Sequence, residues 1–143
     1  MAERAPVPLS FEPLTMISTV DGRYRDKTEQ LAEEVSEFAL IKTRMGIEGL
    51  YLVRLSDTGV ARQFTSQERE RLLSMGPELT LEQARRVKAI EARSRHDVNA
   101  MKDTMKEIFV GTSLADAADS VHLAITSEDI NNLSYRTLIK VNL

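Results

Sequence analysis

The chain has 143 residues, a length typical of one domain, with 42% hydrophobic residues, 29% charged residues and a formal net charge of -3. It contains no Cys, which excludes disulfides, thiolate catalysis and Cys-bound zinc and favours a cytoplasmic location. The acidic balance does not indicate a nucleic-acid partner, and neither a bilayer-spanning run of roughly 20 apolar residues nor the apolar segment of a secretory signal is found, so no membrane partner is expected.

The first predicted segment is an extended lead-in, residues 1–16, which contains three prolines. The polar turn STVDGRYRDK follows, and Gly22 permits a sharp bend that places Arg23 and Tyr24 just after it. The planar donors of Arg23 suit a phosphate or a carboxylate, and Tyr24 adds a hydroxyl. On residue types alone, a surface Arg beside a half-buried Tyr is the commoner outcome.

Apolar residues recur every three or four positions from about Asp26 to Leu55, and this pattern predicts a long helix. At 1.5 Å per residue the helix would be about 45 Å long, so we expect a break near Gly46 or Gly49. The sequence SDTG at 56–59 predicts its end.

Capping residues predict the next three helices. Thr65 or Ser66 begins SQERERLLSM, and the following Gly-Pro pair ends it. Thr80 begins LEQARRVKAIEARS, with Gln83 completing a capping box, and Asp97 begins VNAMKDTMKEIF. The apolar stripe of this third helix comprises Val98, Met101, Met105 and Ile108.

The sequence SLADAADSVHLAI predicts another short helix, and Thr126 begins a last one through SEDINNLSYRTLIK. No stretch alternates in the manner of a strand, so the predicted fold class is all-α. The last helix continues almost to Leu143 without a Gly, a Pro or a polar stop, and we therefore expect the chain to be a fragment of a longer protein.

His96 is the first candidate for chemistry. Between Arg85 and His96 there are five Lys or Arg residues and one Glu, and His96 lies between Arg95 and Asp97 at a predicted helix start. Backbone N–H groups at a helix start favour anions, and a His there can donate to a phosphate or transfer a proton near neutral pH. A lone His is more often a packing or surface residue, and His122, among apolar neighbours, is expected to be a satisfied core histidine.

The stretch TSEDINN, residues 126–132, is the second candidate. Thr126 and Asp129 fit a capping box, and acidic residues in a first turn suit the helix dipole. Two consecutive Asn are mediocre helix formers and indicate partners outside the helix.

No Gly-rich phosphate loop, HExxH, GxSxG or zinc-ligand spacing occurs, and the single candidate His with scattered carboxylates is not a complete catalytic set. The residues by themselves indicate a cytosolic helical domain with two helix N-termini and an Arg-Tyr turn suited to an anionic ligand.

Three motifs in this order resemble adenylosuccinate lyase, a family of the fumarase/aspartase superfamily. STVDGRY is similar to the family's S-P-V-D-G-R-Y, IEARSRHDVNAMKDTMKE to its I-E-x-x-x-x-H-D-V-x-A, and HLAITSEDINNLS to its H-F-x-x-T-S-E-D-I-N-N-L-S. The likeness covers about residues 17–140 and is weak from 51 to 82. It implies a helical N-terminal domain at 17–112 and, at 113–143, the truncated start of a central helical bundle.

The resemblance also implies a reaction. The family eliminates fumarate from adenylosuccinate, giving AMP, and from the succinylated aminoimidazole carboxamide ribonucleotide of purine biosynthesis. A general base removes a proton from the succinyl Cβ, a general acid protonates the departing nitrogen, and no metal or organic cofactor takes part. The full-length protein would be a homotetramer in which three subunits build each site.

Each candidate residue then has an implied role. Arg23 and Tyr24 would hold the nucleotide phosphate. Arg95, His96 and Asp97 would line the nucleotide site, with His96 as a catalytic auxiliary. The next two, Thr126 and Ser127, would donate to the succinyl or fumarate carboxylate.

The family's general acid lies in a T-H-x-Q-P segment and its general base in an S-S-x-M-P-x-K-x-N-P loop, and neither segment occurs here. The chain alone is therefore expected to be inactive. Two alternatives stay open: another lyase of the same superfamily, and a non-enzymatic helical binding module.

Overall fold

The computed structural model describes residues 12–141, so most of the expected lead-in lies outside the described residues. The all-α prediction is confirmed, because the described residues form helices and turns and no strand. None of these helices is both long and apolar enough to cross a membrane. The helices are α1 (Arg25–Thr28), α2 (Ala32–Val35), α3 (Glu37–Asp57), α4 (Ser66–Ser74), α5 (Leu81–Ser94), α6 (Asp97–Phe109) and α7 (Ser127–Val141), with 3-10 helices η1 (Glu29–Leu31) and η2 (Ala115–Ser120).

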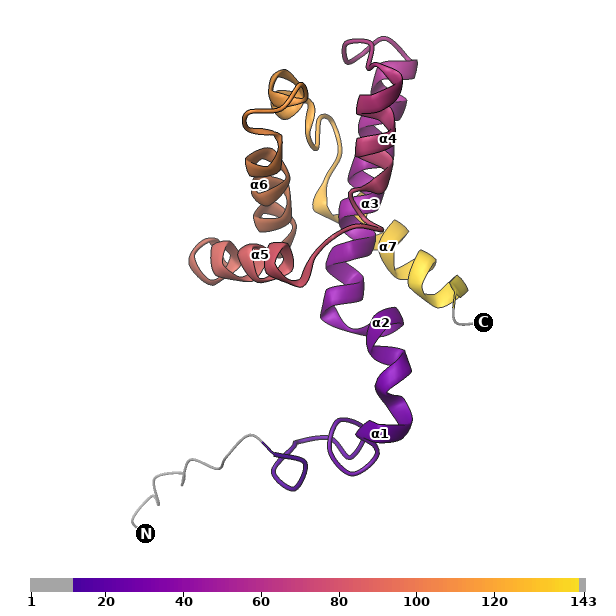
Figure 1. Ribbon diagram of the computed structural model, residues 1–143, viewed down its shortest axis with the longest axis vertical. Coiled ribbons are helices and arrows are strands. Elements are labelled where there is room, and N and C mark those ends of the chain that lie inside the picture. The colour runs from indigo at the N-terminus through magenta and orange to yellow at the C-terminus, as the bar shows by residue number, and fades with distance from the viewer. Residues whose placement is uncertain (1–11, 142–143) are drawn as a thin grey trace.

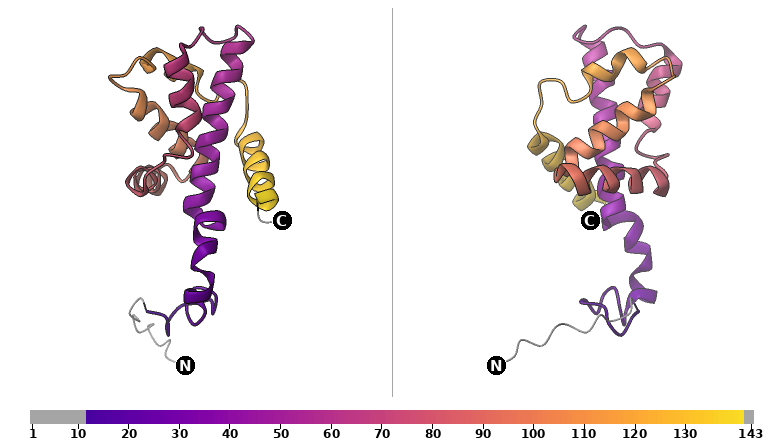
Figure 2. Two further views of the ribbon diagram at one scale, coloured as in Figure 1. Left: turned by 45° about the vertical axis from the view of Figure 1, so that its right-hand side comes forward. Right: turned by 90° about the vertical axis from the view of Figure 1, so that its left-hand side faces the viewer.

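Helix α3 is the axis of the molecule (Figure 1). Helix α4 returns along it, α5 and α6 form an angle on one side, and α7 lies on the other side (Figures 1 and 2). The segment before α3 extends away from this body as an arm, so the molecule is elongated.

The predicted helix over Asp26 to Leu55 is broken, but at a different place. Helix α3 continues through both glycines, and the break falls at Ser36, whose extended backbone (φ -73, ψ 169) begins α3. The Ser36 Oγ accepts the Ala39 N–H at 3.2 Å, which is an N-cap.

The two glycines of α3 serve close packing instead. A Cβ on Gly49 would lie 2.1 Å from the Leu72 carbonyl oxygen, and a Cβ on Gly76 would lie 2.7 Å from the Gly46 Cα. Only hydrogen atoms fit between these backbones, so α3 and the end of α4 meet without side chains between them.

Two of the predicted caps are confirmed and one is shifted. Thr80 and Gln83 form the expected capping box, and Thr65 forms a second one with Glu68. Helix α6 is capped by His96 instead of Asp97, because His96 has the extended backbone and its ring accepts the Asn99 N–H. Asp97 is the first helical residue.

The core lies where α3, α4, α5 and α6 meet, and the α6 stripe contributes to it as predicted. Val98, Met101 and Met105 are fully buried, and Ile108 packs against them partly exposed. Other fully buried apolar side chains are Met45, Leu52, Leu72, Phe109 and Leu114.

The predicted helix over SLADAADSVHLAI is mostly wrong. Only the 3-10 helix η2 forms, and the chain then turns, with positive φ at His122 (65°) and Ala124 (60°). Such angles are incompatible with a right-handed helix. The chain must reverse here to bring α7 beside α3 (Figure 2).

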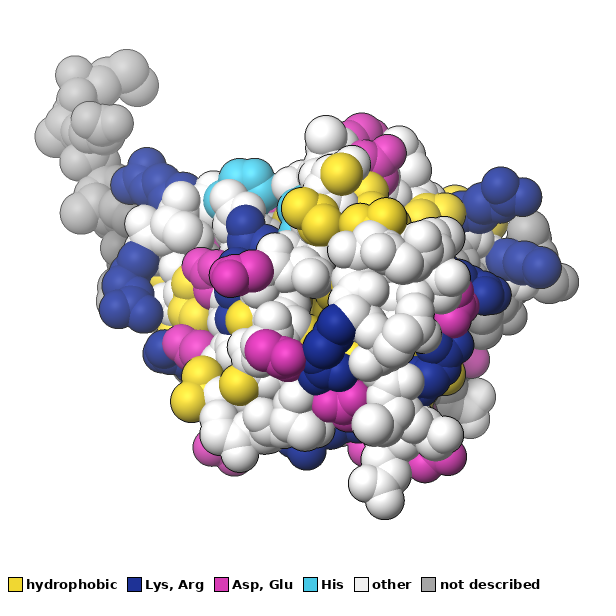
Figure 3. Space-filling model, turned by 90° about the horizontal axis from the view of Figure 1, so that it is seen from above, with side chains coloured by type: hydrophobic (Ala, Val, Ile, Leu, Met, Phe, Trp, Pro, Cys, Tyr) yellow, Lys and Arg dark blue, Asp and Glu magenta, His cyan; other side chains and the backbone are white. Residues whose placement is uncertain are grey.

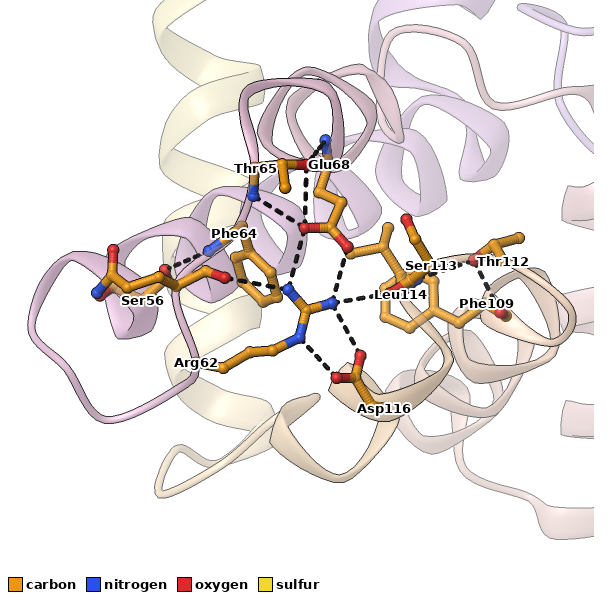
Figure 4. Close-up of polar contacts among 11 residues, drawn as sticks. Ser56, Arg62, Phe64, Thr65, Glu68, Phe109, Thr112, Ser113, Leu114 and Asp116 are labelled. Atoms are coloured by element: carbon orange, nitrogen blue, oxygen red, sulfur yellow. Dashed lines mark hydrogen bonds and ion pairs between the residues drawn. The ribbon is translucent and has the colours of Figure 1, made fainter.

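A cluster of charges joins the α3–α4 loop to η2; we call Arg62, Glu68, Ser113 and Asp116 the Arg62 cluster (Figure 4). The Arg62 guanidinium donates to Glu68 Oε1 at 2.8 Å, to Asp116 Oδ2 at 2.7 Å and to the Ser113 carbonyl at 2.7 Å. It also lies 4.8 Å from the ring centroid of Phe64. These hydrogen bonds, with Arg62 first and the Thr65 N–H next, lower the pKa of Glu68 to about 2.

Candidate anion-binding site at two helix N-termini

The structure brings the starts of α6 and α7 together. Arg95 ends α5 in a left-handed conformation (φ 54) and donates its N–H to the Glu91 carbonyl at 2.7 Å. This turn places His96 at the start of α6, where its Nε2 lies 3.5 Å from the Ser127 Oγ of α7. Residues 31 positions apart therefore share one site, which we call the α6/α7 junction and define by His96, Asp97, Thr126 and Ser127.

The capping bond of His96 decides which ring nitrogen faces the junction. Its Nδ1 accepts the Asn99 N–H at 3.2 Å, so in the neutral imidazole the proton is on Nε2. Nε2 is then a donor directed at Ser127. The side chain is about half exposed. Figure 3 shows one face of the molecule, on which Lys, Arg, Asp and Glu side chains are mixed.

Asp97 is held by a buried arginine. Arg44 of α3 donates to Asp97 Oδ2 at 2.7 Å, and Asp97 Oδ1 accepts the Val98 N–H at 2.8 Å. Burial raises the pKa of Asp97, but the Val98 N–H and Arg44 outweigh it, so the pKa is lowered overall. Asp97 therefore stays ionised and is committed to Arg44.

At the start of α7 the carboxylate half of the predicted capping box is present. Asp129 Oδ2 accepts from the Thr126 N–H at 2.8 Å and from the Thr126 hydroxyl at 2.9 Å. The backbone bond first and the hydroxyl bond second lower the pKa of Asp129. Thr126 is thus occupied by a neighbour, whereas the Ser127 hydroxyl points to His96.

The asparagines of TSEDINN have different positions. Ile130 is buried in the core, Asn132 is exposed, and Asn131 is partly buried with an Oδ1 that has no partner among the described residues. Two more buried polar atoms without a partner within residues 12–141 are Arg44 Nε and Ser134 Oγ. Arg44 belongs to α3, and Asn131 and Ser134 belong to α7.

Arg23 and Tyr24 are not part of this junction in one chain. Both are exposed on the arm, with the Arg23 guanidinium 5.6 Å from the Tyr24 ring centroid, and the arm points away from α6 (Figures 1 and 2). Gly22 makes the expected bend without a positive φ. A Cβ there would lie 2.5 Å from the Pro13 carbonyl oxygen, so the bend requires its small size.

The expectation for His122 is confirmed. Its ring is about nine-tenths buried, and its Nδ1 lies 3.1 Å from Oε2 of the fully buried Glu48. Neither Glu48 nor Arg44 was predicted to be buried. A signal existed, because Arg44 and Glu48 are spaced by four residues and interrupt the apolar pattern between Ile41 and Leu52.

Within the described part of the chain no group of three or more His, Asp or Glu could hold a metal ion. The junction presents the His96 ring nitrogen Nε2 and the Ser127 hydroxyl at the start of a helix. These are the donors that bind a carboxylate or a phosphate. Fold and geometry together give an all-helical arrangement in which two helix N-termini meet at a candidate site for an anion.

No family model matches the chain. It is similar to the curated adenylosuccinate lyase of Haemophilus influenzae, with 35% identity over 135 residues, and to that of Escherichia coli K12, with 34% over 136 residues. The adenylosuccinate lyase of Legionella pneumophila is 32% identical over 136 residues. Each comparison covers 92% of this chain and 30% of the relative, so the chain spans about a third of the length of these enzymes. The resemblance indicated by the three motifs is therefore confirmed.

Proposed function

We propose that this chain forms part of an adenylosuccinate lyase, which eliminates fumarate from adenylosuccinate and from the succinylated aminoimidazole carboxamide ribonucleotide. The similarity to enzymes of that name over 92% of the chain carries this proposal. The contact between His96 and Ser127, which join two of the three motifs, supports it. Such an enzyme works in purine biosynthesis, in the cytoplasm.

In this proposal the α7 N-terminus binds the succinyl carboxylate. β-Elimination passes through a carbanion whose charge spreads onto that carboxylate, so donors aimed at it lower the barrier. Ser127 offers its hydroxyl at a helix start, where the dipole favours an anion, whereas the Thr126 N–H and hydroxyl both donate to Asp129. Asp129 fixes Thr126 at 2.8 Å and leaves Ser127 to the ligand.

His96 has an auxiliary role beside this carboxylate. Its Nε2–H is 3.5 Å from Ser127 Oγ, close enough to share a bound anion with it. Arg95 and Asp97 flank His96 and line the nucleotide side of the site. The general acid and general base would come from the family's later segments, so the 143-residue chain alone should not turn over substrate.

Arg23 and Tyr24 would bind the nucleotide phosphate in the site of a neighbouring copy of the chain, because both lie on the arm. An arm that points away from its own junction is suited to reach a neighbouring copy, as in a homotetramer whose sites combine three subunits. In that assembly residues 17–112 form an N-terminal domain and 113–143 begin the central bundle.

The test is fumarate release by the protein of the complete reading frame that contains this chain. We expect Ser127→Ala and His96→Ala each to lower kcat/KM for adenylosuccinate about 100-fold. Ser74→Ala, at the partly buried last residue of α4, is the matched control and should leave kcat/KM unchanged.

Equal activity on argininosuccinate or aspartate would favour another lyase of the superfamily. A folded protein that releases no fumarate from adenylosuccinate would refute the proposal and favour a non-enzymatic helical module. For the 143-residue chain itself we expect calorimetry to show weak or no binding of AMP, and tight binding would contradict the shared-site arrangement.

A further inference from the structure

The turn before α7 is held in an unfavourable conformation. His122 and Ala124 have φ values of 65° and 60°, which residues other than glycine rarely adopt. Both lie within four residues of Thr126. Such a backbone persists only where surrounding groups determine it, and it often occurs at functional sites.

Two side chains of α3 hold this turn. Glu48 Oε1 accepts the His122 N–H at 2.6 Å, and Glu48 Oε2 lies 3.1 Å from the His122 Nδ1. The Tyr51 hydroxyl donates to the Leu123 carbonyl at 2.7 Å. The backbone donor of one turn residue and the backbone acceptor of the next are therefore both fixed from the same helix.

The bond from Glu48 is not easily replaced. Its side chain is fully buried, and the hydrogen-bond partners found for it among the described residues are both on His122. A buried carboxylate without partners strongly destabilises the folded protein. We therefore expect Glu48 and His122 to stay hydrogen-bonded whenever the protein is folded. The turn thus takes its position from α3.

The same face of α3 also contacts the start of α6, on the His96 side of the junction. Arg44, Glu48 and Tyr51 are spaced by four and three residues, which aligns them along one side of a helix. Arg44 binds Asp97 next to His96, whereas Glu48 and Tyr51 bind the residues just before Ser127. One row of side chains therefore sets the separation between His96 and Ser127.

We propose that Glu48 and Tyr51 are positioning residues for the α6/α7 junction, which hold the turn at 122–124 so that Thr126 and Ser127 face the substrate carboxylate. This inference rests on the proposed lyase function. Neither residue touches the substrate. Displacement of the α7 start by a fraction of an ångström would misalign its donors, and misplacements of about 1 Å cost on the order of 100-fold in rate.

The test compares Glu48→Gln and Tyr51→Phe with matched controls in the protein of the complete reading frame. Gln keeps the length and one acceptor of Glu48, and Phe removes only the Tyr51 hydroxyl. We expect kcat/KM to fall about 10-fold for Tyr51→Phe and more for Glu48→Gln. The controls are Glu68→Gln, which disturbs the other buried carboxylate, and Tyr135→Phe, whose side chain is half exposed on α7. They should change kcat/KM less than twofold.

NMR chemical shifts of the 143-residue chain distinguish a change of position from a loss of stability, because a less stable protein that keeps its folded structure also keeps its chemical shifts. The chain has two His residues, so ring signals of His96 are readily assigned. We expect Glu48→Gln and Tyr51→Phe to shift the Ser127 amide signal and the His96 ring signals, although neither residue contacts them, and the controls to leave both unchanged.

Folded variants with unshifted Ser127 and His96 signals, or losses of kcat/KM no larger than those of the controls, would overturn the positioning role. A wild-type protein without lyase activity would instead refute the proposed function, and the NMR comparison would still decide whether α3 positions the junction. Should Glu48→Gln fail to fold, Tyr51→Phe alone makes both comparisons.

Discussion

Arginines hold carboxylates both in the Arg62 cluster and at the α6/α7 junction, where Arg44 pairs with Asp97, yet the two regions differ in how many of their polar atoms have hydrogen-bond partners. Every nitrogen of the Arg62 guanidinium donates to a carboxylate or a carbonyl of the chain. On α3 and α7, by contrast, Arg44 Nε, Asn131 Oδ1 and Ser134 Oγ are buried without a partner among the described residues.

The Arg62 cluster therefore has the hydrogen bonding of a group that stabilises the fold, whereas α3 and α7 leave polar atoms unpaired. Natural proteins pair nearly all buried polar groups, so these three atoms require an explanation. A ligand at the junction, or further chain packed against α7, would provide one. Matched substitutions in the two regions test this distinction, and four are described below in order of expected effect.

The largest effect is expected for Arg62→Met. It leaves the Glu68 carboxylate, whose side chain is only 7% exposed, without its cation, and breaking such a pair costs about 3 kcal/mol of unfolding free energy. Urea denaturation followed by circular dichroism measures the loss. Arg86→Met, which breaks an exposed pair with Glu107, is the control and should cost far less than Arg62→Met.

The second effect is a pH dependence that belongs to the same cluster. The pKa of Glu68 is about 2 in the folded protein against an ordinary 4.5, so the unfolded chain binds the proton first as the pH falls. The stabilisation is complete above about pH 4.5 and is lost as the pH falls toward 2, by about 2 kcal/mol. Glu68→Gln should flatten this part of the stability curve. An identical slope in the variant would show that other carboxylates cause the loss.

The third effect, for Arg44→Met, should be smaller than for the same substitution at Arg62. Met fills most of the buried volume, and the Asp97 side chain is 44% exposed, so water can hydrate the carboxylate that is left. We expect a loss of about 1 kcal/mol in urea denaturation. If Arg44→Met destabilises as much as Arg62→Met, the junction is as structural as the cluster and the contrast fails.

The smallest effect is expected for Ser134→Ala, for which Ser56→Ala at another buried serine is the comparison. Ser134→Ala removes an unpaired hydroxyl and should be neutral or stabilising by less than about 1 kcal/mol. Ser56→Ala removes the acceptor of the Phe64 N–H and should destabilise by about 1–2 kcal/mol. Thermal unfolding of both variants makes the comparison. An equal loss at Ser134 would mean that its hydroxyl has a partner in solution.

Local features of the fold were predictable from sequence, and long-range ones were not. The Thr65 and Thr80 caps and the apolar stripe of α6 follow from neighbours within four residues. The break at Ser36 was missed because glycine propensity favoured Gly46 and Gly49, where packing against α4 overrides it. The cap of α6 moved to His96 because its ring can accept a backbone N–H as Asp can.

The candidate site shows the same division. Motifs identified His96 and Ser127 separately, but only the turn at His122 and Ala124, which no helical pattern predicts, brings them within 3.5 Å. Glu48 and Arg44 were missed because charged residues within an apolar pattern are normally assigned to the exposed face. Their partners, His122 and Asp97, are more than 50 residues away in sequence.

The glycines of α3 have a consequence for the opposite side of the helix. Residues 46 and 49 lie against α4, and at 3.6 residues per turn Arg44, Glu48 and Tyr51 lie about half a turn away from them. Backbone contact without side chains fixes the rotation of α3 about its own axis. A methyl group at Gly49 would force α3 to rotate away from α4, and all three polar side chains would be displaced with the helix.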